Sequence, residues 1–307
     1  MSLRSESRLE RLLHESVFCV TAEVVPPRSA DRAAVAHQAR GLVGYADAVN
    51  VTDNPTSSAH MSAVAGAALV SATGLEPVLQ MTCRDRNRLG LTSDLLGAWA
   101  LGARNVLCLT GDPPEVGDHP DARTVYDLSV MELVSLADGM RREGRLLSGA
   151  RIDSPPRFFI GVADVPLSPG YTFDRLEEKS EAGADFVQTQ IVFDVEAFES
   201  WAESARARGI FERMFVLVGV AVARGPKSAR YIRDHLPGVI VPDRVIELLE
   251  EAGPDAEAEG VRLTVEVVAK LKAIQGIAGI HVMGLGRMDP VRHVIESAGL
   301  LPRPGLA

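Results

Sequence analysis

The stretch Phe215-Val216-Leu217-Val218-Gly219-Val220-Ala221 contains no charged or amide side chain. A strand with one face in water alternates apolar and polar residues, whereas a parallel strand that is covered on both faces is apolar throughout. Seven more short apolar runs of this type occur along the chain. They are Val17–Val25, Ala48–Thr52, Pro77–Thr82, Asn105–Thr110, Arg157–Ala163, Phe186–Gln190 and Ile277–Met283. The sequence therefore predicts eight buried parallel strands.

Longer amphipathic segments separate these runs, and this alternation is typical of α/β proteins. Ser29 is the expected N-cap of the helix that follows the first strand. Eight strands favour a closed barrel over a doubly wound open sheet, and the 307 residues fit such a barrel, although length alone would also allow two smaller domains. We expect a single (βα)8 TIM-type barrel, formed by residues 1–307 as one catalytic domain, with an N-terminal helix before the first strand.

The composition argues against several functional classes. The net charge is −9 and no stretch is strongly basic, so nucleic acid and anionic membrane surfaces are poor candidates as partners. The three cysteines form no CxxC pair, and the histidines lack the spacing of a metal site, so we expect neither disulfides nor a metal. Residues 1–15 lack the apolar core of a signal peptide, and no run reaches the roughly 20 apolar residues of a membrane span. We expect a cytoplasmic protein.

Polar side chains follow the apolar runs at their C-terminal ends, where the active sites of (βα)8 barrels lie. For Glu23, Asp112 and Gln190, each at or just after the end of a strand, we favour a functional role. Asp53, Asp164 and Asp194 also lie at strand ends, but these could equally cap the helices that follow. There is no complete G-x-G-x-x-G, Walker A or G-x-S-x-G motif. The pattern predicts a mouth lined by carboxylates and amides but does not identify a reaction.

Several of these strand ends resemble the methylenetetrahydrofolate reductase family. Individually the segments are weakly specific, but they occur in the order in which the family has them, up to the end of the sixth strand. They are Thr21-Ala22-Glu23-Val24-Val25-Pro26-Pro27-Arg28, Val49-Asn50-Val51-Thr52-Asp53, Met81-Thr82-Cys83, Asn105–Pro114 followed by Tyr126-Asp127, and Lys179–Asp185 running into Gln188-Thr189-Gln190.

The resemblance implies a flavin-dependent reduction of 5,10-methylenetetrahydrofolate to 5-methyltetrahydrofolate, with electrons from NADH or NADPH. The bridging methylene must open to an iminium before it accepts hydride, and this opening needs a proton on the leaving nitrogen. Glu23 matches the family's general acid, Asp112 matches a catalytic carboxylate beside the flavin and the pterin, and Gln190 matches a pterin-binding amide. Thr52 is implied on the folate side. The positions implied for FAD are Thr82, Gly111, Asp112, Tyr126 and Lys179.

Three departures from the family pattern lie on the flavin side. Gln80 stands where the family usually has His, and Thr110 stands where it usually has Arg. The segment Asp164–Gly170 replaces a loop that usually carries a His. Losing an Arg and a His weakens the recognition of a diphosphate. Three interpretations remain open, which are FAD bound differently, FMN in its place, or no flavin and direct hydride transfer from the nicotinamide.

Two further hypotheses come from other classes of protein. The chain could be a folate- or flavin-binding subunit that acts beside a partner redox subunit in a larger one-carbon complex, and a homo-oligomer is also possible. It could instead be an unrelated lyase or aldolase that forms a Schiff base through Lys179 or Lys227. Both lysines fall in or at the start of predicted helices, whereas a strand end is expected for such a lysine, so the sequence disfavours this last alternative.

Overall fold

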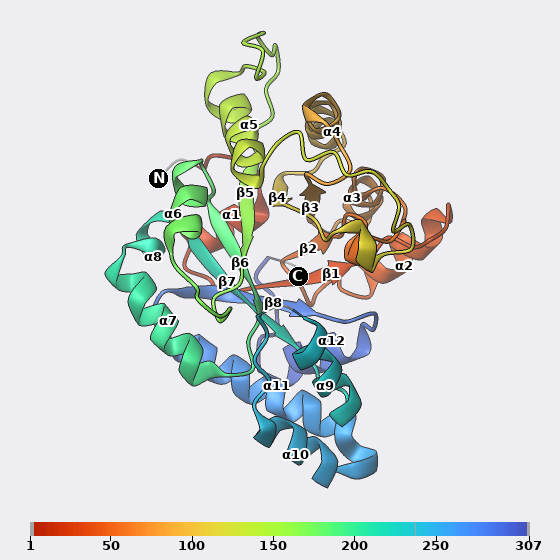
Figure 1. Cartoon of the computed structure of the whole chain (residues 1–307), viewed down its shortest axis with the longest axis vertical. Coiled ribbons are helices and arrows are strands. Elements are labelled where there is room, and N and C mark those ends of the chain that lie inside the picture. The colour runs from red at the N-terminus through yellow and green to blue at the C-terminus, as the bar shows by residue number, and fades with distance from the viewer. Residues whose placement is uncertain (1–2, 237, 306–307) are drawn as a thin grey trace.

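The computed structural model describes residues 3–236 and 238–305, and its eight strands form a closed parallel barrel in the order β1 to β8 (Figure 1). The predicted (βα)8 barrel is therefore confirmed, and the strands differ from the expected runs only at their ends. The strands are β1 Cys19–Val24, β2 Ala48–Val51, β3 Pro77–Thr82, β4 Asn105–Leu109, β5 Phe159–Asp164, β6 Phe186–Ile191, β7 Phe215–Ala221 and β8 Ile277–Met283.

Helices surround the barrel, with α9 to α11 toward the bottom of Figure 1 and α3 to α5 toward the top. None of the helices in residues 3–236 and 238–305 is both long enough and apolar enough to cross a bilayer. The α-helices are α1 Arg8–His14, α2 Arg32–Arg40, α3 Ala63–Ser71, α4 Arg88–Ala100, α5 Val130–Glu143, α6 Asp174–Glu181, α7 Val195–Ala207, α8 Ile210–Arg213, α9 Pro226–His235, α10 Asp243–Glu251, α11 Ala256–Ala273 and α12 Asp289–Ser297. Three short 3-10 helices are η1 Pro55–Ser57, η2 Pro114–Val116 and η3 Gly253–Asp255.

The start of α2 corrects one local prediction. Asp31, and not Ser29, is the N-cap, because its side chain accepts a hydrogen bond from the backbone N–H of Ala33. The hydroxyl of Ser29 accepts from the backbone N–H of Asp31 instead, so it orders the turn just before the cap. Both residue types form such turns, and the carboxylate two residues further on takes the capping position.

The N-terminal helix α1 covers the end of the barrel opposite the mouth. Its residues Leu9, Leu12 and Leu13 are buried against the innermost side chains of the strands, which include Phe159 and Phe186. The rings of these two phenylalanines stack with their centroids 5.0 Å apart. Because apolar side chains close this end, the mouth at the C-terminal ends of the strands is where polar residues can gather around a ligand.

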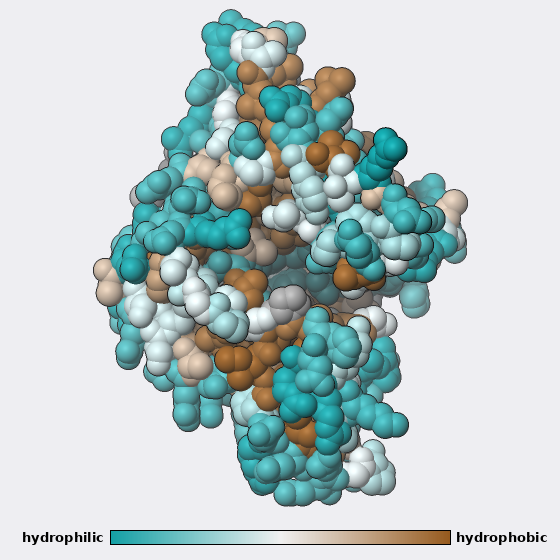
Figure 2. Space-filling view, in the orientation of Figure 1, coloured by the Kyte–Doolittle hydropathy of each residue, from teal (hydrophilic) through white to brown (hydrophobic). Residues whose placement is uncertain are grey.

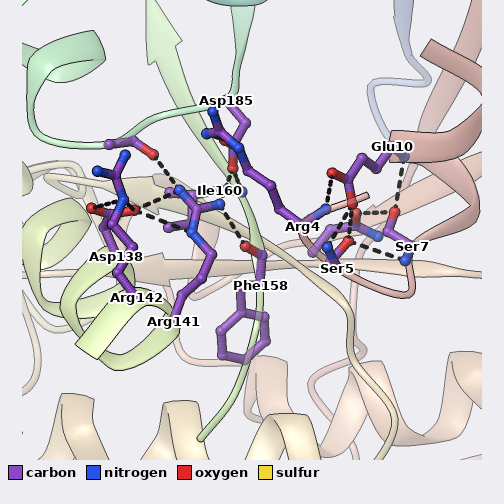
Figure 3. A network of polar contacts seen from close by, with 12 residues as sticks. Arg4, Ser5, Ser7, Glu10, Asp138, Arg141, Arg142, Phe158, Ile160 and Asp185 are labelled. Atoms are coloured by element: carbon purple, nitrogen blue, oxygen red, sulfur yellow. Dashed lines mark hydrogen bonds and ion pairs between the residues drawn. The ribbon is translucent and has the colours of Figure 1, made fainter. Parts of the chain in front are cut away.

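Ion pairs with buried aspartates hold α1 and the chain before it to this closed end. Asp185, just before β6, accepts hydrogen bonds from Arg4 at 2.6 Å and from Arg141 of α5 at 2.5 Å (Figure 3). Its carboxylate also accepts from the backbone N–H of Ile160 in β5 at 2.8 Å. One buried carboxylate therefore joins the N-terminal segment, α5 and the strand pair β5–β6.

Asp47, just before β2, has the same role as Asp185 has before β6. Its carboxylate accepts from the backbone N–H of Val20 in β1 at 2.8 Å. It also pairs with Arg8 of α1 at 3.1 Å and with Arg303 at 2.5 Å. Arg303 is buried, so this pair also fixes the described end of the C-terminal segment to the barrel.

Candidate active site

A cavity of about 170 Å³ opens at the C-terminal ends of the strands. In the view of Figure 2 the surface is hollowed near the centre of the molecule, with apolar residues gathered beside the hollow and hydrophilic residues around it. Two of the predicted site residues, Glu23 and Gln190, line this cavity together. The other polar side chains that line it are Asn50, Gln80, Asp164, Gln188, Thr189 and His281.

Glu23 lies in β1, one residue from its end, and its side chain is 20% exposed. Its Oε1 lies 3.6 Å from Nε2 of His281 in β8, the strand that closes the barrel beside β1. The His281 ring is buried, and its Nδ1 lies 2.9 Å from the hydroxyl of Thr21. The carboxyl therefore faces the cavity on one side and a buried imidazole on the other, as a group that exchanges protons with a ligand requires.

The floor of the cavity carries a pair of amides. Asn50 in β2 donates from Nδ2 to Oε1 of Gln188 in β6 at 2.7 Å, and Gln188 Nε2 lies 3.2 Å from Asn50 Oδ1. Gln188 Nε2 also donates to the hydroxyl of Thr21 at 3.3 Å. A continuous chain of buried polar contacts therefore runs from β2 through β6 and β1 to His281.

Gln190 is turned toward the mouth by an irregularity in β6. The register between β6 and β7 shifts between Gln188 and Ile191, and such a bulge re-aims the side chains beside it. Gly219 of β7 allows this, because a Cβ there would lie 2.4 Å from the carbonyl oxygen of Thr189. The side-chain Oε1 of Gln190 accepts from the backbone N–H of Ile191 at 3.0 Å, so its NH₂ group is the part left to meet a ligand.

Asp112 and Gly111 lie in the loop after β4 and do not line the cavity that Glu23 lines. The Asp112 side chain is exposed, and its Oδ2 accepts from the backbone N–H of Thr56 at 3.1 Å. Gly111 has φ +94, and a Cβ there would lie 3.1 Å from Cβ of Thr82, so only glycine suits this turn. Tyr126 is half exposed further along the same loop. The structure thus places these positions on the β2–β4 side of the mouth.

Arg84, which the sequence did not single out, organises that side. Its buried guanidinium forms two hydrogen bonds with Asp85, at 2.7 and 2.8 Å. It also donates to the backbone carbonyl of Asp112 at 3.0 Å and to that of Asn54 at 3.3 Å. One arginine therefore fixes the loops after β2, β3 and β4 relative to one another.

Thr52 and Thr82 are both buried. The Thr82 hydroxyl and backbone N–H both donate to Asp53 at 2.9 Å, and Asp53 pairs with Arg86 at 2.8 Å. The hydroxyl of Thr52 has no hydrogen-bond partner among the described residues. Asp53 is therefore a buried ion-pair partner and not a helix cap. Its carboxylate also accepts the hydrogen bond that the Thr82 hydroxyl can donate.

Lys179 lies beside a second hollow of about 420 Å³ that shares Asp164 with the central cavity. Its Nζ donates to the backbone carbonyl of Ala163 at 2.6 Å and lies 3.9 Å from Asp164. Burial lowers the pKa of Lys179, and it raises the pKa of Asp164, whose carboxylate accepts from the hydroxyl of Tyr171 at 2.7 Å. Lys179 is therefore fixed to β5, and Asp164 is not a helix cap.

A third hollow of about 300 Å³ adjoins the cavity on the other side and shares Glu23 with it. Pro26, Pro27 and Met288 give it an apolar wall, and Arg28 and His60 add polar groups. Glu23 thus lies where two hollows meet, so a ligand in either one can reach its carboxyl group.

The sequence did not assign roles to Asn50, Gln188 and His281. The sequence feature that could have identified these three residues is a polar residue inside an otherwise apolar strand. Such a residue in a closed barrel points inward or is paired. His281 has no metal-ligand spacing to another histidine in the sequence. Its partners Thr21 and Glu23 come from β1, more than 250 positions away in the chain, and only barrel closure between β1 and β8 brings them together.

Comparisons with known proteins identify the family of the chain. The family model described as "Methylenetetrahydrofolate reductase" matches residues 8–299. A Caenorhabditis elegans protein named "Probable methylenetetrahydrofolate reductase (NADPH)" is 26% identical over 95% of this chain and 44% of its own length. Methylenetetrahydrofolate reductase 1 of Schizosaccharomyces pombe is 29% identical over 74% of this chain and 36% of its own length. The chain therefore spans less than half of these two relatives.

Shorter relatives align over more of their own length. The 5,10-methylenetetrahydrofolate reductase of Escherichia coli is 24% identical over 76% of this chain and 73% of its own length. Among solved structures, a Clostridium thermocellum protein described as binding two copies of 5-methyl-5,6,7,8-tetrahydrofolic acid superposes with a TM-score of 0.66 and 11% identity. That superposition covers 94% of this chain and 97% of the other, and it supports the fold.

Proposed function

Because the chain belongs to the methylenetetrahydrofolate reductase family, we propose that it reduces 5,10-methylenetetrahydrofolate to 5-methyltetrahydrofolate with a reduced nicotinamide as electron donor. One observation carries the proposal. Glu23, which the resemblance matches to the family's acid, lines an open cavity and is backed by the buried ring of His281 at 3.6 Å. The named relatives carry the name of reductases of this substrate, one of them as a probable one, and the structural neighbour is described as a binder of the product.

In the proposed reaction, the carboxyl of Glu23 gives its proton to the leaving nitrogen of the five-membered ring. The C–N bond to the bridging methylene breaks, and the methylene becomes an iminium on the other nitrogen. Hydride then adds to this carbon and forms the methyl group, while the nicotinamide becomes oxidised. Proton and hydride together account for the two hydrogens gained. The N–H of His281 would stabilise the Glu23 carboxylate left behind.

Gln190 and Asp112 have supporting roles in the proposal. The free NH₂ group of Gln190 beside the cavity suits the ring oxygen of a pterin. The exposed carboxylate of Asp112, in the loop after β4, is proposed to add negative charge near the cationic iminium. Thr52, whose hydroxyl lacks a partner among the described residues, is proposed on the folate side.

FAD is the cofactor that the resemblance implies, but the flavin-side residues do not fit its diphosphate. The ammonium of Lys179 is held by the Ala163 carbonyl and faces Asp164. The Thr82 hydroxyl is held by Asp53, and Thr110 supplies no charge. A diphosphate needs several cations or N–H groups that are free to turn toward it, and the hollow beside Lys179 offers one further cation, Arg175. We therefore derive no step through a flavin, and the proposed reaction takes hydride from the nicotinamide itself.

The test is to purify the protein, record its visible absorption spectrum and follow the oxidation of NADH and NADPH with 5,10-methylenetetrahydrofolate. We expect a colourless protein that oxidises one of the two nucleotides only when the folate is present. A bound flavin identified by its spectrum and mass would contradict direct transfer while leaving the reductase intact. No turnover with either nucleotide would contradict the reductase and favour the subunit of a larger one-carbon complex, which a partner redox subunit would then have to activate.

A further inference from the structure

Asn50 and Gln188 occupy equivalent places in opposite quarters of the barrel. Asn50 lies three residues after Asp47, and Gln188 lies three residues after Asp185. The two aspartates have the same role, because each accepts the backbone N–H of the preceding strand at 2.8 Å just before its own strand begins. Equal offsets from equivalent anchors place both amides at the same height in the barrel. Since β2 and β6 face each other across its axis, the two side chains meet there.

The two amides are directed by their hydrogen bonds. Asn50 Nδ2 donates to Gln188 Oε1 at 2.7 Å, so this oxygen points to Asn50. The NH₂ group of Gln188 donates to Asn50 Oδ1 at 3.2 Å and to the hydroxyl of Thr21 at 3.3 Å. Asn50, Gln188 and Thr21 have relative exposures of 1%, 3% and 0%, so water does not replace these contacts.

The hydrogen bond from Gln188 determines where the Thr21 hydroxyl donates its own hydrogen, and that in turn determines the tautomer of His281. Because the Thr21 oxygen accepts from Gln188, its own hydrogen is free to be donated elsewhere. Two acceptors are in reach, which are Nδ1 of His281 at 2.9 Å and the carbonyl of Ile280 at 3.3 Å. The shorter contact takes the hydrogen, and accepting a bond from Gln188 strengthens the hydroxyl as a donor. Nδ1 therefore carries no hydrogen in the neutral ring, and Nε2 carries it toward Glu23.

We propose that Asn50 and Gln188 are positioning residues that fix the tautomer of His281, so that its Nε2–H faces the carboxyl of Glu23. This inference rests on the proposed reductase function for its effect on catalysis. A buried asparagine–glutamine pair is not needed to fill the barrel, because apolar residues of similar shape fill the layer below it. The contribution of the Asn50–Gln188 pair is the direction of its hydrogen bonds, because a histidine in the wrong tautomer cannot support its catalytic partner.

The test compares Gln188→Glu with the wild type. An ionised glutamate at this position has no N–H to donate and accepts the hydrogen of Thr21, so Nδ1 of His281 must become the donor. Gln188→Met removes the polar group at nearly constant shape and serves if the charged variant does not fold. The matched control for the tautomer is Gln80→Met, because Gln80 also lines the cavity but makes none of these contacts with Thr21, Asn50 or His281.

The tautomer is read directly from the ¹⁵N shifts of the histidine ring nitrogens at a pH where the ring is neutral. The signals of His281 are identified by their loss in His281→Gln. We expect an Nε2–H ring in the wild type and in Gln80→Met, an Nδ1–H ring in Gln188→Glu, and a mixture in Gln188→Met. In parallel, kcat should fall by about 10- to 100-fold in both Gln188 variants, with little change in KM for the folate.

An unchanged Nε2–H ring in the Gln188 variants would overturn the inference, and so would a changed tautomer with wild-type kcat. A rise in KM at constant kcat would also overturn it, because it would make Gln188 a ligand-binding residue. Absence of reductase activity in the wild type would contradict the proposed function alone, since the ¹⁵N measurement of the tautomer needs no turnover.

Discussion

Replacing Asp185 with alanine should destabilise the protein strongly, because this carboxylate is the shared partner of three donors. Its side chain is 4% exposed, as is that of Arg141, which it binds at 2.5 Å. It also accepts from Arg4 and from the backbone N–H of Ile160 (Figure 3). The alanine variant leaves the Arg141 charge buried with only part of its compensation, since Asp138 remains at 2.6 Å.

The expected loss follows from that geometry. Removing one partner of a buried ion pair costs about 3–5 kcal/mol, because the remaining charge stays out of water. Globular proteins gain about 2.1 cal/mol/K of unfolding entropy per residue, so for this chain the loss corresponds to a fall of about 5–8 °C in Tm. Asp185→Asn keeps an acceptor for Ile160 and should fall between wild type and alanine.

The assay is thermal unfolding followed by circular dichroism, with Asp234→Ala as the control. Asp234 forms an exposed pair with Arg233, and its loss should cost about 1 kcal/mol or less. The double variant Asp185→Leu with Arg141→Met should recover part of the loss, because it removes the uncompensated charge. A fall in Tm for Asp185→Ala no larger than that of the control would refute the reasoning.

Three further outcomes are expected. Burial raises the pKa of Asp164 in the folded state above its value in the unfolded state. Protonation of Asp164 therefore contributes its whole stabilisation below the unfolded-state pKa, and this contribution is lost as the pH rises through the folded-state pKa. Relative to Asp164→Asn, the wild type should therefore gain stability as the pH falls from about 7 to about 4, and a pH-independent difference in Tm would speak against this. Gly161→Ala should lower the free energy of unfolding by about 1–3 kcal/mol, because its Cβ would lie 2.2 Å from the Phe186 ring. A Cβ at Gly97 meets open space, so Gly97→Ala should stabilise α4. Equal Tm values for the two variants would count against this packing. All three thiols are buried with raised pKa, so a thiol reagent should label none of them before unfolding and all of them after it, and labelling of the native protein would disprove their burial.

The barrel was predictable because parallel strands carry their own signal. Runs such as Phe215–Ala221 are apolar throughout, and counting them along the chain gave the closed barrel. The closed end was not predictable in the same way. Asp47, Asp185 and Arg303 look like ordinary surface charges in the sequence, and only the folded chain brings their partners together across the base of the barrel.

The site, too, was predictable only in part. Glu23 and Gln190 were predicted at the mouth, and they line one cavity. His281 was missed because its partners are at the other end of the chain, and side-chain direction inside a strand decides the contact. Lys179 was assigned to FAD because the resemblance implies that position, and that prediction stays untested. Its bond to the Ala163 carbonyl depends on how α6 packs on β5, and the sequence does not contain that packing.

The role of Glu23 is the central claim, and Glu23→Gln tests it most directly. The measurement is the rate of folate-dependent nicotinamide oxidation by this variant, set beside calorimetric binding of the folate, with the exposed Glu15→Gln as control. The account predicts a fall of about 10²- to 10⁴-fold in rate with folate binding retained, because the amide keeps the shape of the side chain but has no proton to give. Turnover by Glu23→Gln at the wild-type rate would contradict the account.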